Sequence, residues 1–151
     1  MAKIELTNMV MIQNKKTGQV VVQDRTKNYC GIAFPGGHIE NNESIHASAI
    51  REIKEETGLD IWNLKFCGFV HWYNNHSNDR NITYCYKTSD FSGNMLTKTE
   101  EGKVFWANLT DFSPERLAPN MDIYLQIFNN GNFTEIYCSS NENEPKKIVY
   151  L

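Results

Sequence analysis

The stretch Gly37–Leu59 reads GHIENNESIHASAIREIKEETGL. Within it, residues 44–57 show the apolar spacing of an amphipathic helix, and Gly58 follows in the position of a C-terminal capping residue. Three residues near the start offer a side-chain oxygen as N-cap: Asn41, Asn42 and Ser44. The sequence therefore predicts a helix over 44–57 whose isoleucine face packs on a sheet.

Three glutamates share another face of this helix. At about 100° per residue, Glu52, Glu55 and Glu56 lie within an arc of about 100°. Like charges at these spacings destabilise a helix by about 0.2–0.5 kcal/mol per pair, and the helix dipole disfavours anions at this end. Mg²⁺ or Mn²⁺ would make the cluster favourable, because hard cations prefer oxygen ligands. The alternative is a solvated acidic face paired with Arg51 and Lys54.

The surrounding residues resemble the Nudix box, Gly-x5-Glu-x7-Arg-Glu-U-x-Glu-Glu-x-Gly-U, where U is aliphatic. The chain matches every defined position, with Gly37, Glu43, Arg51, Glu52, Ile53, Glu55, Glu56, Gly58 and Leu59. The resemblance implies an α+β protein with the Nudix-type α/β/α sandwich, in which a mixed β-sheet lies between helices. It also implies a metal-dependent hydrolase that cleaves the pyrophosphate bond of a nucleoside diphosphate linked to another group.

The resemblance further implies a set of metal ligands. Glu52, Glu55 and Glu56 would hold Mg²⁺ or Mn²⁺ as cofactor, together with the carbonyl of Gly36. Members of the family often add a glutamate from the second half of the fold. Two neighbouring residues are candidates for this ligand, Glu100 and Glu101, and the sequence does not choose between them.

The remaining box residues have supporting roles by the same resemblance. Arg51 and Glu43 resemble the ion pair that supports the catalytic glutamates, Glu52 and Glu55, and Glu52 is also a candidate for activating water. Two glycines are expected to be structural, shaping the loop before the helix and its end: Gly37 and Gly58.

Residues outside the box are candidates for substrate binding. The family often places a phosphate-binding cation where this chain has Arg25 and Lys27, although both could equally be surface cations. Three aromatic residues could stack on a base, although strand aromatics are more often core residues: Phe34, Trp72 and Tyr73. Asn120 could hydrogen-bond a base edge, and we expect it to cap a helix beginning at Met121 and to lie near Trp72.

The wider chain is similar to the MutT-like group, the 8-oxo-dGTP diphosphatase type of nucleoside triphosphate pyrophosphohydrolase. Two departures concern the base pocket. The group has Trp-Pro-Asp-Asp where this chain has Ala118-Pro119-Asn120-Met121, and a base-reading Asn where this chain has Ala33. The acidic pair that reads the purine edge is thus reduced to Asn120. We therefore expect pyrophosphatase chemistry with a weaker preference for oxidised guanine.

Composition limits the partners and the compartment. The 151 residues include 15 Lys+Arg and 18 Asp+Glu, a net charge of −3, which argues against a strongly basic binder of duplex nucleic acid. No apolar run approaches the roughly 18 residues of a membrane span, and MAKIELTNMV is not a secretory signal. The cysteines are scattered, as expected for reduced thiols. We expect one cytoplasmic domain, residues 1–151, either monomeric or homodimeric, whose partner is a small-molecule nucleotide.

The rest of the pattern suggests an arrangement of strands. Alternation over 4–12 and 19–23, with a turn signal between them, predicts a β-hairpin, and residues 24–35 read as a loop. Further strands are expected over 64–73, 82–86, 103–106, 133–138 and 148–151.

Two classes of function remain after these observations. The first is hydrolysis of a nucleoside triphosphate to the monophosphate and pyrophosphate, or of another nucleoside diphosphate-linked compound. The second is a non-catalytic nucleotide-binding module. Such modules usually lack one of the box carboxylates, and here none is lost.

Overall fold

In a computed structural model of the protein, which describes residues 1–129 and 131–151, the two larger of three sheets lie between two α-helices. The helices are α1 (Ile45–Thr57) and α2 (Met121–Asn129), with short 3-10 turns at Leu109–Asp111 and Pro114–Arg116. The strands are β1 (Ile4–Ile12), β2 (Val20–Arg25), β3 (Gly31–Ala33), β4 (Asp60–Trp62), β5 (Lys65–Asn74), β6 (Arg80–Thr88), β7 (Asp90–Ser92), β8 (Lys98–Thr99), β9 (Gly102–Ala107), β10 (Glu135–Asn141) and β11 (Glu144–Tyr150).

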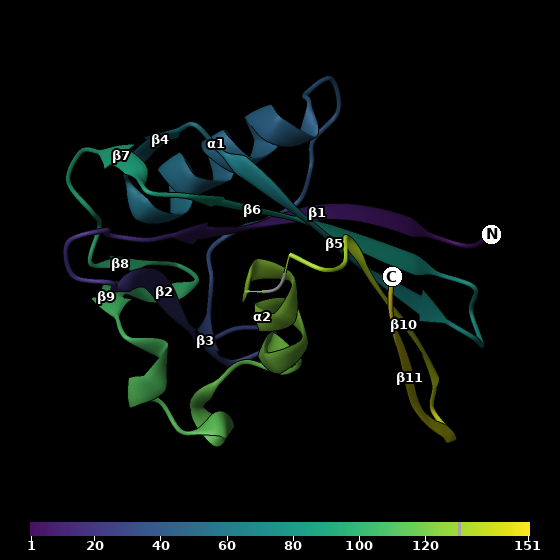
Figure 1. Ribbon diagram of the computed structural model, residues 1–151. Helices are drawn as coiled ribbons and strands as arrows, with labels where there is room; N and C mark the ends of the chain where they lie inside the picture. The colour runs from purple at the N-terminus through teal and green to yellow at the C-terminus, as the bar shows by residue number, and fades with distance from the viewer. Residues whose placement is uncertain (130) are drawn as a thin grey trace.

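The larger sheet is mixed and has the order β1-β6-β5-β10-β11. β1 runs parallel to β6, and β10 runs parallel to β5, while the other neighbours are antiparallel. The second sheet is antiparallel, in the order β3-β2-β9-β8. Figure 1 shows α1 and α2 on opposite sides of the strands, which confirms the predicted α+β sandwich with a mixed sheet.

Each helix has its own hydrophobic cluster, because strand side chains alternate between faces. Val10 and Val21 pack with Ile53 of α1, whereas Met11 and Val22 belong to the cluster that contains α2. The strands are therefore buried on both faces where the helices cover them. None of the helices in the described part of the chain is long and apolar enough to cross a lipid bilayer.

The predicted β-hairpin between the first two strands is wrong. β1 and β2 lie in different sheets and share a single bridge, Gln13↔Val20. β1 instead pairs in parallel along its length with β6, from Ile4↔Arg80 to Ile12↔Thr88. Parallel pairing joins strands that are distant in sequence, so the local turn signal did not reveal it. The segment predicted as a loop over 24–35 also contains the end of β2 and the whole of β3.

Helix α1 agrees with its prediction at both ends. Ser44, one of three candidate N-caps, accepts a hydrogen bond from the backbone N–H of Ala47 at 2.9 Å. At the other end Gly58 has φ +78°, and its N–H donates to the carbonyl of Lys54. Most residues avoid this left-handed conformation, so glycine is the suitable residue there.

The loop between β3 and α1 depends on Gly36 for close contact with β1. A Cβ atom at Gly36 would lie 2.1 Å from the carbonyl oxygen of Asn8 and 2.8 Å from the Cα of Met9. Both are backbone atoms and cannot move aside independently. The replacement of Gly36 by any larger residue therefore requires the loop or β1 to shift.

We expect Gly36→Ala to lower the free energy of unfolding by about 1–3 kcal/mol, the usual cost of overpacking. Urea denaturation measures this change. The matched control is Gly131→Ala, whose Cβ would meet no atom within 4 Å. Equal midpoints for the two variants would contradict the close contact between Gly36 and β1.

Candidate active site

One pocket of about 900 Å³ extends from the box helix to the start of α2. Glu52 and Glu56 line one end, with the loop glycines Gly36 and Gly37 beside them. The other end is formed by residues from β5, β6 and α2 and their flanking segments, including Trp72, Thr83, Asn120 and Tyr124. The pocket therefore has an anionic end and a mainly neutral, aromatic end.

Arg51 organises the anionic end. Its Nη2 and Nε atoms donate to the two carboxylate oxygens of Glu43, at 2.6 and 2.9 Å, and Nη2 also donates to the carbonyl of His38 at 3.0 Å. Bidentate contacts of this kind are strong and directional. The hydrogen bonds from Arg51 lower the pKa of Glu43 to about 2. The structure thus brings the predicted Arg51–Glu43 pair together and ties the loop to the helix.

Glu52 is held between Arg51 and the glycine loop. Arg51 Nη1 donates to Glu52 Oε1 at 2.9 Å, and the Glu52 side chain is 13% exposed. Burial raises the pKa of Glu52, although the contact with Arg51 opposes this rise. A Cβ at Gly37 would lie 2.5 Å from the Glu52 carboxylate. A glycine at this position therefore leaves room for the glutamate.

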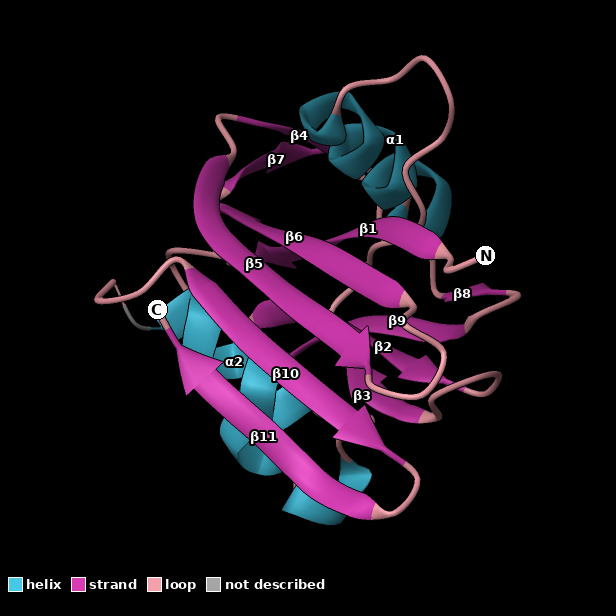
Figure 2. Cartoon of the chain, turned by 90° about the vertical axis from the view of Figure 1, so that its right-hand side faces the viewer, coloured by secondary structure: helices cyan, strands magenta, loops and turns pink. Residues whose placement is uncertain are grey.

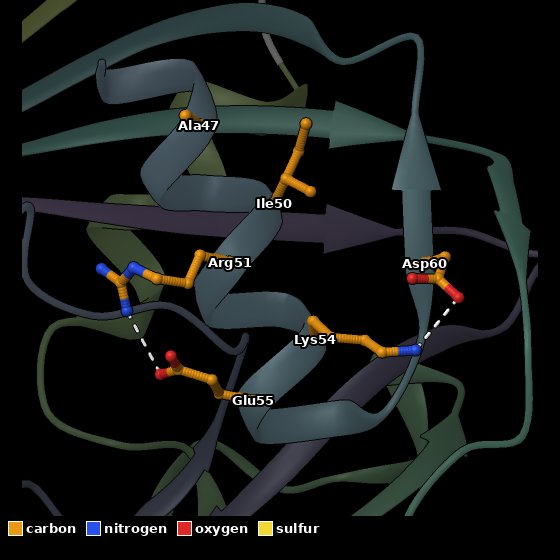
Figure 3. Close-up of a pocket in the computed structure, with 6 residues that line it drawn as sticks. All are labelled: Ala47, Ile50, Arg51, Lys54, Glu55 and Asp60. Carbon is orange, nitrogen blue, oxygen red and sulfur yellow. Dashed lines mark hydrogen bonds and ion pairs between the residues drawn. The ribbon is translucent and has the colours of Figure 1, made fainter. Parts of the chain in front are cut away.

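Glu55 is the most open of the three helix glutamates. Its side chain is 58% exposed, and Oε2 accepts from Arg51 Nη1 at 3.2 Å. Figure 3 shows this pair on the outer side of α1, where Lys54 also reaches Asp60 at 3.0 Å. The solvated ion pairs that the sequence left as an alternative are therefore present for Glu55. For Glu52 and Glu56, which line the pocket, solvation does not by itself explain why like-charged side chains lie close together.

Glu56 is the most deeply buried carboxylate of the cluster. Its Oε2 accepts from the N–H of Gly36 at 3.0 Å and from Gln23 Nε2 at 2.9 Å. Burial nevertheless raises the pKa of Glu56 to about 7. Gln23 is fully buried, and its Oε1 has no hydrogen-bond partner in the described part of the chain. Sequence reasoning missed Gln23, which appears there only as a polar residue ending an apolar strand.

The donor set suits a hard divalent cation. Carboxylates with raised pKa values face the same pocket, and a cation placed there would offset the cost of burying their charge. Among the described residues, no three His, Cys, Asp or Glu side chains converge closely enough to hold a metal ion in their present rotamers. Glu52 and Glu55 are turned toward Arg51, so these side chains would have to rotate to share a metal ion.

The sequence left two pairs of candidates open, and in each pair the structure places one residue in the pocket and the other outside it. Glu101 lines the pocket with Glu52 and Glu56, whereas Glu100 is exposed and does not line it. Arg25 also lines the pocket and contacts Glu101 Oε2 at 3.4 Å, whereas Lys27 is exposed outside it. Of these four residues, Glu101 and Arg25 therefore lie in the pocket with the box glutamates.

We expect Arg25→Ala to raise KM or lower kcat by the equivalent of about 1–3 kcal/mol, the scale of a charge-assisted hydrogen bond to phosphate. Lys27→Ala, the matched control, should keep wild-type kinetics because Lys27 lies outside the pocket. Steady-state kinetics with the preferred nucleotide measures both effects. Wild-type values for Arg25→Ala would remove this residue from the site.

The aromatic end contains the predicted stacking candidates in unequal positions. Phe34 lines the pocket but is only 2% exposed and packs edge-on against Phe128, so it serves mainly as core. Tyr73 also lines the pocket, beneath the guanidinium of Arg80 at 4.6 Å. Trp72 donates from Nε1 to the Tyr124 hydroxyl at 2.9 Å, which fixes the indole orientation.

Asn120 lies in the same pocket as Trp72, as expected, but it does not cap α2 through its side chain. Its φ is +66°, and its backbone carbonyl accepts from the N–H of Ile123. The Oδ1 atom instead accepts a hydrogen bond from Lys146 Nζ. The helix begins at Met121, so Asn120 stands at the predicted N-cap position, but its side-chain oxygen is engaged by this tertiary contact, which the local sequence does not reveal.

The match to the NUDIX domain model covers residues 5–127, which include the helix, its carboxylates and the residues of the second sheet. This chain belongs to the NUDIX family. A curated relative, the uncharacterized Nudix hydrolase YvcI of Bacillus subtilis (strain 168), is 32% identical over 88 residues. That match covers 56% of each chain, so this chain spans little more than half the length of that relative.

Solved structures share the fold over most of their length. The MutT protein from Bacillus halodurans superposes with a TM-score of 0.74 and 18% identity, covering 95% of this chain and 97% of that one. The NUDIX domain of Shewanella oneidensis NrtR, solved with ADP ribose, gives a TM-score of 0.65 and 16% identity over 85% of this chain and 86% of that one. At these identities the likeness concerns the fold.

Proposed function

We propose that this protein is a divalent-metal-dependent pyrophosphohydrolase that converts a nucleoside triphosphate to the monophosphate and pyrophosphate. The observation that carries the proposal is a single pocket that joins Glu52, Glu56 and Arg25 to Trp72 and its aromatic surroundings. One end suits a metal-bound diphosphate, and the other suits a base. An acidic helix with only a structural role would not require the second end.

The residues divide the chemistry as follows. In the proposed reaction Glu52 takes the proton of the water that attacks phosphorus while the bond to the leaving phosphate oxygen breaks. Arg51 keeps the Glu52 carboxylate oriented, and Arg25, which lines the same pocket, would bind phosphate. Glu56 and Glu101 would provide further oxygen ligands for the cation. Bound Mg²⁺ would supply the positive charge that neutralises the diphosphate and makes water more acidic.

The proposal does not rest on an oxidised base. The resemblance of the sequence to the MutT-like group favours a nucleoside triphosphate, with 8-oxo-dGTP as one candidate, whereas Asn120 replaces an acidic pair in that group. The NrtR domain with ADP ribose motivates the alternative, another nucleoside diphosphate-linked substrate. A non-catalytic nucleotide-binding module is the remaining alternative.

A nucleotide panel with Mg²⁺ and inorganic pyrophosphatase tests the proposal through phosphate release. We expect the protein to hydrolyse nucleoside triphosphates. We also expect kcat/KM for 8-oxo-dGTP to exceed kcat/KM for dGTP by less than several orders of magnitude. Asn120→Ala should change that ratio, since a pocket that hydrogen-bonds a base edge discriminates through those contacts. Binding without any turnover would favour the non-catalytic module. A large ratio that survives the substitution would show that other residues read the base.

A further inference from the structure

Lys146, on β11, lies outside the pocket lining and contacts two of the lining residues at its aromatic end. Its Nζ lies 5.6 Å from the centroid of the Trp72 ring, within the range of a cation–π contact. The same atom donates a hydrogen bond to Asn120 Oδ1. Trp72 and Asn120 both line the pocket, so the two contacts place a cation beside the expected base position.

Sheet pairing explains how a C-terminal lysine arrives there. β10 lies between β5 and β11, with Cys138 opposite Trp72 on one side and Ile148 on the other. Cys138 belongs to the hydrophobic cluster of α2, and Trp72 packs against that cluster. Figure 2 shows β10 and β11 at the edge of the sheet with α2 behind them. Lys147 pairs with Ser139 and so alternates onto the opposite face from Ile148.

Lys146 and Asn120 both carry hydrogen-bond donors beside the base position. A lysine ammonium has three N–H donors and no acceptor. Asn120 Oδ1 accepts from Lys146, and the amide NH₂ of Asn120 carries two further N–H donors. A base with a carbonyl oxygen would satisfy these donors. Adenine presents an amino group at position 6, which is a donor and cannot accept a hydrogen bond from Lys146.

We propose that Lys146 is a specificity-determining residue that selects nucleotides with a 6-oxopurine base, such as guanine or hypoxanthine, over adenine nucleotides. This inference rests on the proposed function for the assignment of the pocket to a nucleotide. In MutT-like enzymes an acidic pair contacts the purine edge, whereas in this protein the cation Lys146 would make that contact. The residue supplies donors to the base carbonyl and takes no part in the phosphate chemistry.

Binding of dIMP and dAMP, measured by calorimetry, tests the inference without hydrolysis. The two bases differ only at the 6-oxo or 6-amino group and the adjoining ring nitrogen. We expect wild-type protein to bind dIMP roughly tenfold more tightly than dAMP, the low end of a charged hydrogen bond. Lys146→Met, which keeps the chain length without the charge, should bring the two affinities within about twofold, whereas Lys146→Arg should retain the preference.

The control is Lys147→Met, which removes the same charge on the opposite face and should keep the wild-type ratio. Equal weakening of both ligands by Lys146→Met would show that the ammonium binds a shared group such as the phosphate, and would overturn the inference. A wild-type protein that binds neither ligand, or both equally, would overturn it as well. Selective dIMP binding without triphosphate hydrolysis would leave the inference standing while the proposed function fails.

Discussion

Exhaustive chelation of divalent cations should abolish nucleotide hydrolysis by this protein, and added Mg²⁺ or Mn²⁺ should restore it. Glu52 and Glu56 are partly buried carboxylates with raised pKa values at the anionic end of the pocket. Without a cation, an incoming diphosphate would add negative charge to this anionic surface. With a 2+ ion, the same oxygens become ligands and the phosphate charge is neutralised.

Phosphate release before chelation, after chelation and after readdition of each metal measures this dependence. Circular dichroism on the same samples controls for unfolding. A metal that binds only the folded state should also raise the thermal midpoint as its concentration increases. Full turnover after exhaustive chelation would exclude the proposed metal-dependent mechanism.

Replacement of Glu52 by glutamine should lower kcat by about 10²–10⁴-fold, the usual contribution of a general base. Glutamine keeps the size of the side chain but cannot accept the proton from water. Stability should change little, because the burial that raises the Glu52 pKa already disfavours its charge. Glu55→Gln should have a smaller effect, since that side chain is 58% exposed on the outer side of α1.

The matched control for Glu52→Gln is Asp60→Asn, which removes a carboxylate that pairs with Lys54 outside the pocket. We expect wild-type kcat from this control. Single-turnover kinetics with saturating Mg²⁺ separates a chemical defect from weaker metal or substrate binding. A Glu52→Gln variant with near wild-type kcat would require another residue to accept the proton.

The box helix shows how much of the site local sequence could predict. Spacing of three and four residues predicts the bounds of the helix and the shared face of its glutamates, and residue type predicts its capping residues. The Arg51–Glu43 pair also lies within this short stretch, only 8 residues apart. Such features depend on the geometry of one helix and its adjoining loop, so a single motif was sufficient to predict them.

The pairing of strands was harder to predict from the sequence. The sequence indicated strands near β1 and β2 but joined them as a hairpin, because the turn between them resembles a hairpin turn. The true neighbour of β1 is β6, with Ile4 opposite Arg80. A turn signal reports the local path of the chain and does not identify which distant strand will pair.

Sequence alone was sufficient to identify the Nudix box and the carboxylate helix, and to predict a metal bound by oxygen ligands. Tertiary structure decided which residues lie beside this helix: Glu101 rather than Glu100, Arg25 rather than Lys27, and Gln23 in contact with Glu56. It also decided that Lys146 would lie over Trp72 beside Asn120. The physical reason is range, because helix periodicity orders residues within a few turns, whereas sheet pairing and core packing bring together side chains that are far apart along the chain.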